Sequence, residues 1–199
     1  SNTESNYEHT LNKTLDLIDL SKKQSVSSFI VFKPSAVGRF DLYLKKSNND
    51  SLNENEIDEW QRVEQRYDQI CNSAAKSGIS ILIDAEESWI QKSIDELIEK
   101  LMIKYNNSSC IVYNTIQTYR IDRFEYLSDL YKRLSKSNIK IGIKLVRGAY
   151  MEKERIRAKS NNYKSPICET KLKTDENYNN CMSFIFSNIN DFNLFIGSH

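Results

Sequence analysis

The chain is 199 residues long and almost neutral, with 28 basic and 27 acidic side chains and a formal net charge of +1. That balance gives no electrostatic reason to expect a nucleic acid or an anionic membrane surface as partner. Hydrophobic residues make up 39% of the chain and aromatic residues 11%, which is enough for a folded core. One large domain or two small ones is therefore expected.

Cysteine and histidine are too few and too scattered to predict a metal site or a disulfide framework. The four cysteines form no CxxC pair and are expected to be reduced thiols. Only His9 and His199 could supply imidazole ligands, so no metal site is predicted. No apolar run approaches the roughly 20 residues of a membrane span. The polar N-terminus has the composition of neither a signal peptide nor an Arg-rich transit sequence.

The first third of the chain predicts a helix, a short strand and a second helix. Apolar residues recur at helical spacing over residues 7–18. Residues 27–39 (SSFIVFKPSAVGR) predict a strand followed by a loop, because a proline and a glycine interrupt the apolar run. A polar loop over 47–56 then precedes a helix that is expected to span 57–78 and to end at its glycine.

Buried strands and helical stripes alternate through the rest of the chain. Four further strands are expected, over residues 79–88, 110–117, 139–150 and 192–199. Helices are expected over residues 89–102 and 124–134, in a charged segment that begins at 151, and around 178–185. Such alternation is typical of parallel strands joined by helical crossovers. The strands are apolar on both faces, as expected when both faces are covered.

Every predicted strand ends in polar side chains. These are Lys33, Asp84, Glu86, Asn114, Gln117, Lys144, Arg147, Ser198 and His199. The carboxyl ends of the strands build the active site of a β/α barrel. A doubly wound sheet would also place ligands there, but more often with a Gly-rich loop, and none of the five glycines forms one. The fold class predicted is α/β, a β/α barrel with about five strands in this chain.

Several of these segments resemble the FAD-dependent proline dehydrogenase family, in particular its single-activity members. They are LIDAEES (82–88), VYNTIQTYR (112–120), KLVRGAYMEKER (144–155), SPICETKLKTD (165–175) and GSH (197–199). In addition, FKPSAVGR (32–39) fits the family's early lysine-bearing strand. The motifs occur in the family's order across nearly the whole chain. The resemblance implies a TIM-like barrel with FAD lying over the strand ends.

The resemblance also implies an activity. The family oxidises L-proline to 1-pyrroline-5-carboxylate by hydride transfer to FAD, which is the first step of proline catabolism. The electrons pass on to a membrane quinone, so peripheral membrane association is expected, and oligomerisation is a further expectation. The implied location is the cytoplasm or the inner face of a bacterial membrane, with the mitochondrion as the alternative.

Site residues follow from the matching motifs. The resemblance implies that Asp84 and Lys144 are catalytic and that Lys33 and Tyr150 border the proline. The cofactor-binding residues that it implies are Ala85, Gln117, Arg147, Gly148, Ala149, Thr170, Lys171, Thr174, Ser198 and His199.

The cations at the end of the fourth predicted strand have a physical reason within this resemblance. A reduced flavin is anionic, so a fixed cation such as Lys144 near the ring would stabilise it. Arg147 would supply charge to the pyrophosphate, and Gly148 would allow close backbone approach. On the residues alone, the same two cations could instead pair with Asp84 or Glu86 as structural ions.

Two other functions stay open at this stage. Asp84 and Glu86 share one strand face if the strand continues, and paired carboxylates would suit a hydrolase built on another β/α barrel. The same DAEES segment also suits a strand end followed by a helix cap at Ser88. A non-catalytic interaction domain derived from a barrel is the third possibility.

The chain is short for a complete barrel, which typically takes about 250 residues. We expect residues 1–199 to be a partial barrel domain that lacks the family's first strand and its C-terminal strands and helix. That helix carries an arginine pair that clamps the substrate carboxylate, and no Arg-Arg pair occurs in this sequence. We therefore expect the piece alone to be inactive. We also expect an uncovered lumen, exposing Ile81, Ile83, Val112 and Ile143 or their lumen-facing neighbours.

Overall fold

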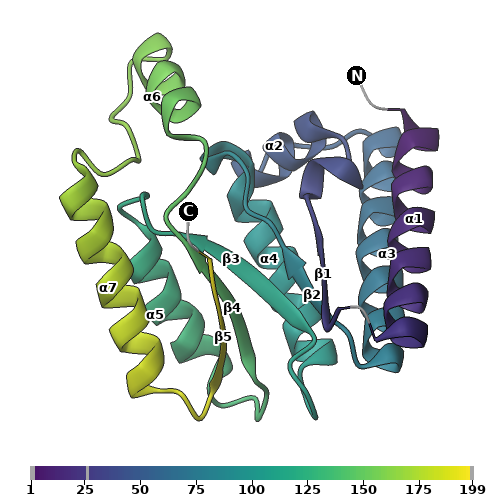
Figure 1. Ribbon diagram of the computed structural model, residues 1–199. Helices are drawn as coiled ribbons and strands as arrows, with labels where there is room; N and C mark the ends of the chain where they lie inside the picture. Colours follow the sequence, from purple (N-terminus) through teal and green to yellow (C-terminus); the bar gives the residue numbers. More distant parts are fainter. Residues whose placement is uncertain (1–2, 26, 198–199) are drawn as a thin grey trace.

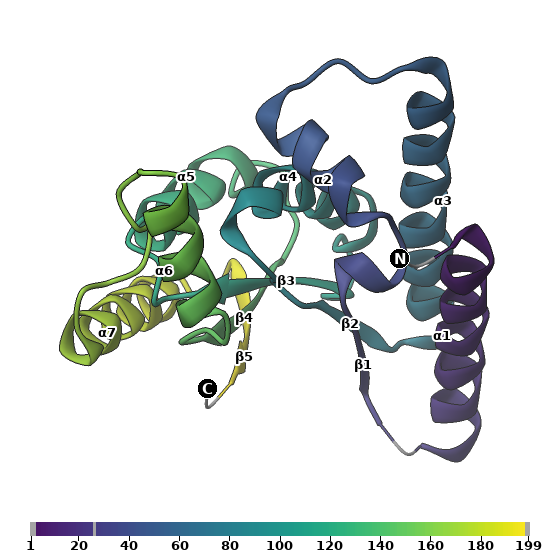
Figure 2. The same cartoon turned by 90° about the horizontal axis from the view of Figure 1, so that it is seen from above.

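Five parallel strands form one curved sheet with helices along its outer side (Figure 1). The computed structural model describes residues 3–25 and 27–197. The strands pair in chain order as β1 (Phe29–Phe32), β2 (Ser80–Ile83), β3 (Val112–Gln117), β4 (Ile141–Val146) and β5 (Phe192–Ile196). Seen from above, the sheet curls into an open arc whose two ends are β1 and β5 (Figure 2).

The helices occupy the crossovers between the strands. They are α1 (Glu4–Gln24), α2 (Phe40–Asn48), α3 (Glu54–Ser77), α4 (Ser88–Tyr105), α5 (Arg123–Leu134), α6 (Met151–Ser160) and α7 (Lys171–Ser187), with a short 3-10 helix η1 (Pro34–Ala36). Helix α6 stands apart from the others, beyond the carboxyl ends of the strands (Figure 1). No helix within the described residues is long and apolar enough to cross a membrane.

The predicted order of strands and helices is confirmed, with corrections at the carboxyl ends of the strands. The β2 strand ends at Ile83 rather than continuing to residue 88, and β4 ends at Val146 rather than at 150. Ser88 is the first residue of α4 and not its cap, which is Glu87. The segment after β1, predicted as a loop, contains η1, and α2 follows it and runs into the predicted 47–56 loop. Helix α2 is stabilised by packing against α4.

The sequence left open whether Ile81, Ile83, Val112 and Ile143 or their neighbours in the strands face the lumen, and the structure excludes the first four. Ile81, Ile83, Val112 and Ile143 are fully buried against the helices and do not face the lumen. Their neighbours alternate to the inner face because the side-chain period of a strand is two. The rings of Phe29 on β1 and Phe195 on β5 meet with centroids 5.0 Å apart, so the two end strands approach each other across the inner side of the arc.

Strand register places the inner-face residues in rows. Thr115 pairs with Lys144, and Lys144 pairs with Phe195. Lys33 and Asp84 each follow a paired residue of β1 and β2, and so they join the same row. This row near the carboxyl edge of the inner face therefore carries two lysines, a carboxylate and a hydroxyl, and the pair of Gln117 and Val146 lies beyond it on the same face.

Candidate active site

Lys144 and Asp84 form an ion pair at the carboxyl edge. The Lys144 Nζ atom lies 2.6 Å from Asp84 Oδ1, and the two side chains are 17% and 25% exposed. The sequence had left open whether Lys144 pairs with a strand-end carboxylate, and it does. Because both groups remain open to solvent on one side, the pair can still face a bound molecule.

Gln117 offers a buried hydrogen-bond acceptor at the same edge. Its side chain is 2% exposed, and Nε2 donates to the Ala85 carbonyl over 3.3 Å. Its Oε1 atom has no hydrogen-bond partner within the described residues. A buried acceptor without a partner costs free energy unless a ligand or water supplies a donor. Gln117 is therefore suited to receive a donor from a ligand.

Gly148 sits where no side chain fits. Its φ is +135°, a region that favours glycine, and an added Cβ would come within 2.4 Å of the Tyr119 ring. Tyr119 in turn donates its backbone N–H to the Arg147 carbonyl over 2.7 Å. The loop after β4 is thus held close over Tyr119, with bare backbone exposed at Gly148.

Most of the predicted site residues line one cavity of about 250 Å³. Its lining consists of Lys33, Asp84, Ala85, Thr115, Gln117, Lys144, Val146, Gly148, Ala149 and Tyr150. Sequence reasoning missed Thr115 and Val146. Both were detectable only through register, since Thr115 shares the row of Lys144 and Val146 lies two residues further along the same face. Thr115 donates from Oγ1 to the Ile83 carbonyl over 2.7 Å.

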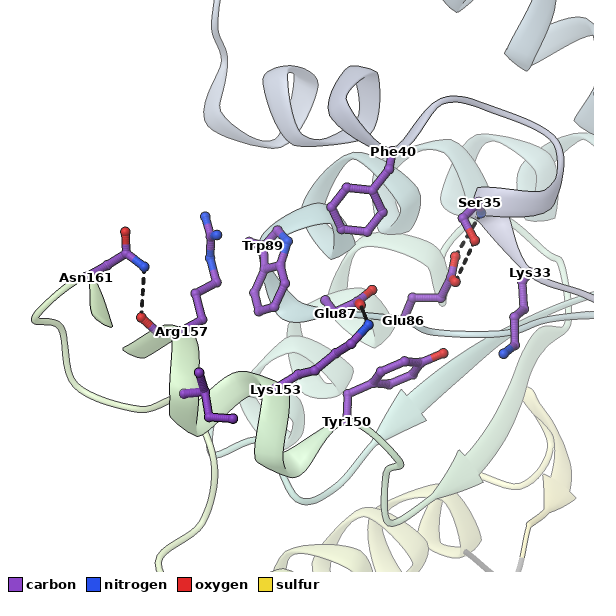
Figure 3. A pocket seen from close by; sticks show the side chains of 11 residues that line it. Lys33, Ser35, Phe40, Glu86, Glu87, Trp89, Tyr150, Lys153, Arg157 and Asn161 are labelled. Atoms are coloured by element: carbon purple, nitrogen blue, oxygen red, sulfur yellow. Dashed lines mark hydrogen bonds and ion pairs between the residues drawn. The ribbon is translucent and has the colours of Figure 1, made fainter. Parts of the chain in front are cut away.

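Lys33 and Tyr150 also border a second, larger cavity of about 850 Å³, shown in Figure 3. The neighbouring phenol of Tyr150 raises the pKa of Lys33, so the lysine stays charged. On the far side of this cavity, Trp89 stacks with Arg157, whose guanidinium carbon lies 4.4 Å from the centre of the Trp89 ring. The two predicted substrate residues therefore lie between both cavities.

Asp84 and Glu86, two of the three carboxylates of the DAEES segment, have separate hydrogen-bond partners. Glu86 is buried and accepts hydrogen bonds from the Ser35 backbone N–H at 2.8 Å and from its hydroxyl at 2.7 Å (Figure 3). Asp84 instead pairs with Lys144. The segment leaves the strand after Ile83, so the shared strand face on which the hydrolase alternative depended is absent here.

Helix α6 is fastened to the start of α4 by three consecutive contacts. Glu154 is fully buried and accepts from both the backbone N–H and the hydroxyl of Ser88, each over 2.6 Å. Lys153 pairs with Glu87 at 2.8 Å, and Arg157 stacks on the ring of Trp89. We call the Glu154–Ser88 contact the α6 latch. It holds the helix whose N-cap is Tyr150.

Four further predicted cofactor residues lie at or beside the start of α7, outside the 250 Å³ cavity: Arg147, Thr170, Lys171 and Thr174. Arg147 donates from Nε to Asp175 over 2.7 Å rather than pairing with Glu86, and Lys171 pairs with the same carboxylate at 2.5 Å. Thr170 caps the helix by accepting from the Lys173 backbone N–H.

Thr174 is buried within the first turn of α7. Ser198 and His199 lie outside the described residues. The four cysteines are buried free thiols, as expected.

The chain is similar in sequence to known proteins along most or all of its length. The family model described as proline dehydrogenase matches residues 1–199. The carbapenem antibiotics biosynthesis protein CarD of Pectobacterium carotovorum subsp. carotovorum is 30% identical over 198 residues, covering 100% of this chain and 52% of CarD. Mitochondrial proline dehydrogenase 2 of Arabidopsis thaliana is 38% identical over 162 residues, covering 80% of this chain and 33% of that protein.

A solved structure has the same fold. Proline utilization A (PutA) from Bdellovibrio bacteriovorus, inactivated by N-propargylglycine, superimposes with a TM-score of 0.82 at 19% identity, covering 98% of this chain and 21% of that one. The chain thus spans about half or less of the length of the relatives it matches. With the family model matched from the first residue to the last, the chain belongs to the proline dehydrogenase family.

Proposed function

We propose that the full-length protein oxidises L-proline to 1-pyrroline-5-carboxylate with FAD as the bound oxidant. The single observation that supports this most is the row of Lys33, Asp84, Thr115 and Lys144 near the carboxyl edge of the sheet. Next to it lies the Gln117 Oε1 acceptor, which has no hydrogen-bond partner among the described residues. Loss of a hydride from a ring carbon and of a proton from nitrogen turns the secondary amine into a cyclic imine. FAD, when bound, accepts the hydride as a two-electron oxidant.

The residues present suit a flavin on two counts. The buried Gln117 Oε1 atom needs a donor, which a flavin N–H would supply. Gly148 presents backbone without a side chain at the edge of the cavity, where a Cβ would collide with the Tyr119 ring. We propose that Gln117, Lys144, Ala85 and the Gly148–Ala149 backbone hold the flavin ring and its attached chain.

Lys144 and Asp84 have complementary tasks in this proposal. Lys144 keeps a positive charge beside the site and so favours an electron-rich ring. Asp84 fixes the Lys144 ammonium at 2.6 Å and also places a negative charge where the substrate nitrogen becomes an iminium cation. Lys33, held charged beside Tyr150, is suited to face the substrate carboxylate.

We further propose that a membrane quinone reoxidises the flavin, with the protein associated peripherally with the membrane. The support is the family alone, whose mitochondrial members include the Arabidopsis relative. For this chain, both a bacterial inner membrane face and a mitochondrion remain part of the proposal, as does oligomerisation.

Activity of an Asp84→Ala variant tests the proposed function. Turnover of L-proline by the full-length protein should fall at least about tenfold, which corresponds to about 1.4 kcal/mol in the barrier. Asp58→Ala is the matched control, because Asp58 is an exposed carboxylate on α3 that lines neither cavity. Wild-type turnover in Asp84→Ala would remove Asp84 from the mechanism, and an inactive wild-type protein would refute proline oxidation itself.

A further inference from the structure

Arg147 is held from two sides by a single helix. Its Nε atom donates to Asp175 Oδ1 over 2.7 Å, and its guanidinium carbon lies 4.6 Å from the centre of the Tyr178 ring. Asp175 and Tyr178 are three residues apart on α7, so both project from one face of that helix. The guanidinium is therefore fixed along one edge and over one face.

The open part of this guanidinium is its pair of terminal amino groups. Arginine carries five N–H donors, and the contact with Asp175 uses the one on Nε. Within the part of the chain that the structure describes, neither Nη atom has a hydrogen-bond partner. The free edge forms a planar fork, which matches two oxygens of a phosphate or carboxylate better than a single lysine charge does.

Asp175 is kept in place by a second cation. Its other oxygen accepts from Lys171 over 2.5 Å, in the first turn of α7. Both carboxylate oxygens are thus engaged, and Asp175 is not free to turn toward the Nη groups. Arg147, Lys171 and Asp175 together keep one net positive charge, so the cluster still attracts an anion.

Tyr178 also contacts Gly197, the residue that follows β5. Its ring is 6% exposed, and its hydroxyl donates to the Gly197 carbonyl over 3.4 Å. The ring therefore cannot move away from the guanidinium without leaving the contact between α7 and the sheet. Stacking of a guanidinium on an aromatic face stabilises one orientation of the arginine.

We propose that Asp175 and Tyr178 are positioning residues that aim the Nη edge of Arg147 at the diphosphate of FAD. This rests on the proposed function for the identity of the ligand. Neither residue binds the phosphates itself. They lower the conformational freedom that Arg147 would otherwise lose when the anion binds, and so they raise affinity without adding contacts.

Flavin binding by the full-length protein tests this directly. We expect Asp175→Ala and Tyr178→Leu each to weaken FAD binding about tenfold, which corresponds to about 1.4 kcal/mol. Glu176→Ala removes one exposed carboxylate from the neighbouring position and should stay within about twofold of wild type. Tyr178→Phe keeps the ring but loses the hydroxyl contact with Gly197, so it should weaken FAD binding less than Tyr178→Leu does. Riboflavin lacks both phosphates, and its affinity should not change in any of these variants.

A double-mutant cycle separates positioning from other roles. In an Arg147→Ala background, Asp175→Ala and Tyr178→Leu should each weaken FAD binding by less than about a further twofold, because there is no guanidinium left to position. An equal loss in that background, or an equal loss of riboflavin binding, would overturn the inference. Tighter FAD binding by Asp175→Ala would also overturn it, since Asp175 would then be competing with the phosphates.

The outcome distinguishes this inference from the proposed function. A wild-type protein that binds no FAD refutes both. A protein that binds FAD equally well with and without Asp175 and Tyr178 refutes only the positioning role. Circular dichroism of Tyr178→Leu checks that the buried substitution leaves the fold intact, and the partly exposed Asp175→Ala provides the second variant if it does not.

Discussion

Removing the Ser88 hydroxyl should destabilise the protein more than an ordinary hydroxyl deletion. In the α6 latch, that hydroxyl and the Ser88 backbone N–H each lie 2.6 Å from a fully buried Glu154 carboxylate. Hydrogen bonds to charged groups contribute about 1.5–3 kcal/mol each, and a buried oxygen left without a donor keeps its desolvation cost. Ser88→Ala should therefore lower the free energy of unfolding by about 2 kcal/mol.

Glu154→Gln should cost more, about 3 kcal/mol, although it conserves shape. The amide has one acceptor oxygen, and its NH₂ group would face one of the two Ser88 donors. The exposed Glu152 on the same helix gives the matched control, and Glu152→Gln should change stability by less than about 0.5 kcal/mol. For a chain of this size, the Ser88→Ala loss corresponds to a fall of about 4–8 °C in melting temperature.

Urea unfolding followed by circular dichroism measures these differences. The two latch substitutions share one interaction, so the double variant should lose less than the sum of the single losses. Ser88→Ala within about 0.5 kcal/mol of wild type, or Glu154→Gln no worse than Glu152→Gln, would refute the assignment of the latch as a stabilising contact.

Three further outcomes follow from the site and its surroundings. Lys144→Met should lower the midpoint potential of bound flavin by tens of millivolts. One charge several Å away, at an effective dielectric near 20, contributes roughly 2–3 kcal/mol before Asp84 offsets part of it. An unchanged potential in spectroelectrochemistry, with FAD still bound, would reject that role. Gly148→Ala should weaken FAD binding and lower stability by about 1–3 kcal/mol, because its Cβ would meet Tyr119 at positive φ, and calorimetry that finds neither change would contradict the close approach. Hydrogen bonds from Lys171 and Arg147 lower the pKa of Asp175 in the folded protein below its ordinary value of 3.8. The contribution of Asp175 to stability is therefore fully present above pH 3.8 and is lost as the pH falls through the pKa of the folded state. An acid titration of stability that is identical in Asp175→Asn and wild type would show that Asp175 contributes nothing.

The sequence was sufficient for the alternation of the five strands with helices, apart from η1 and α2, and for the residues at the strand ends. Alternation of strands and helices, with polar side chains after each strand, predicted which residues meet at one edge. Eight of the predicted site residues do line a single cavity. The row that relates Thr115 to Lys144 needed the register, because pairing between strands is set by contacts far apart in the chain.

The assignment of strand faces could not be made from the pattern. Strands buried on both faces carry no alternation of polarity, so Ile81 and Leu82 were equivalent in the sequence. Only the curvature of the sheet places Ile81 against the helices and its neighbour on the inner side.

The contacts that hold α6 and Arg147 in place could not be predicted from the sequence either. The segment MEKERIRAKS predicts an exposed helix, and nothing in its composition marks Glu154 as the fully buried member. Asp175 meets Arg147 across 28 residues of sequence, a separation at which residue spacing carries no information about contact. Both contacts follow from how α6 and α7 dock on the edge of the sheet.

Anaerobic mixing of the full-length protein with L-proline shows directly whether bound FAD oxidises proline. In the absence of any electron acceptor other than the bound FAD, we expect the FAD to lose its visible absorbance and one cyclic imine to form for each flavin reduced. The stoichiometry follows because a hydride carries both electrons to a two-electron acceptor. A protein that carries FAD but keeps it oxidised in saturating L-proline, or that forms no imine, would contradict the account.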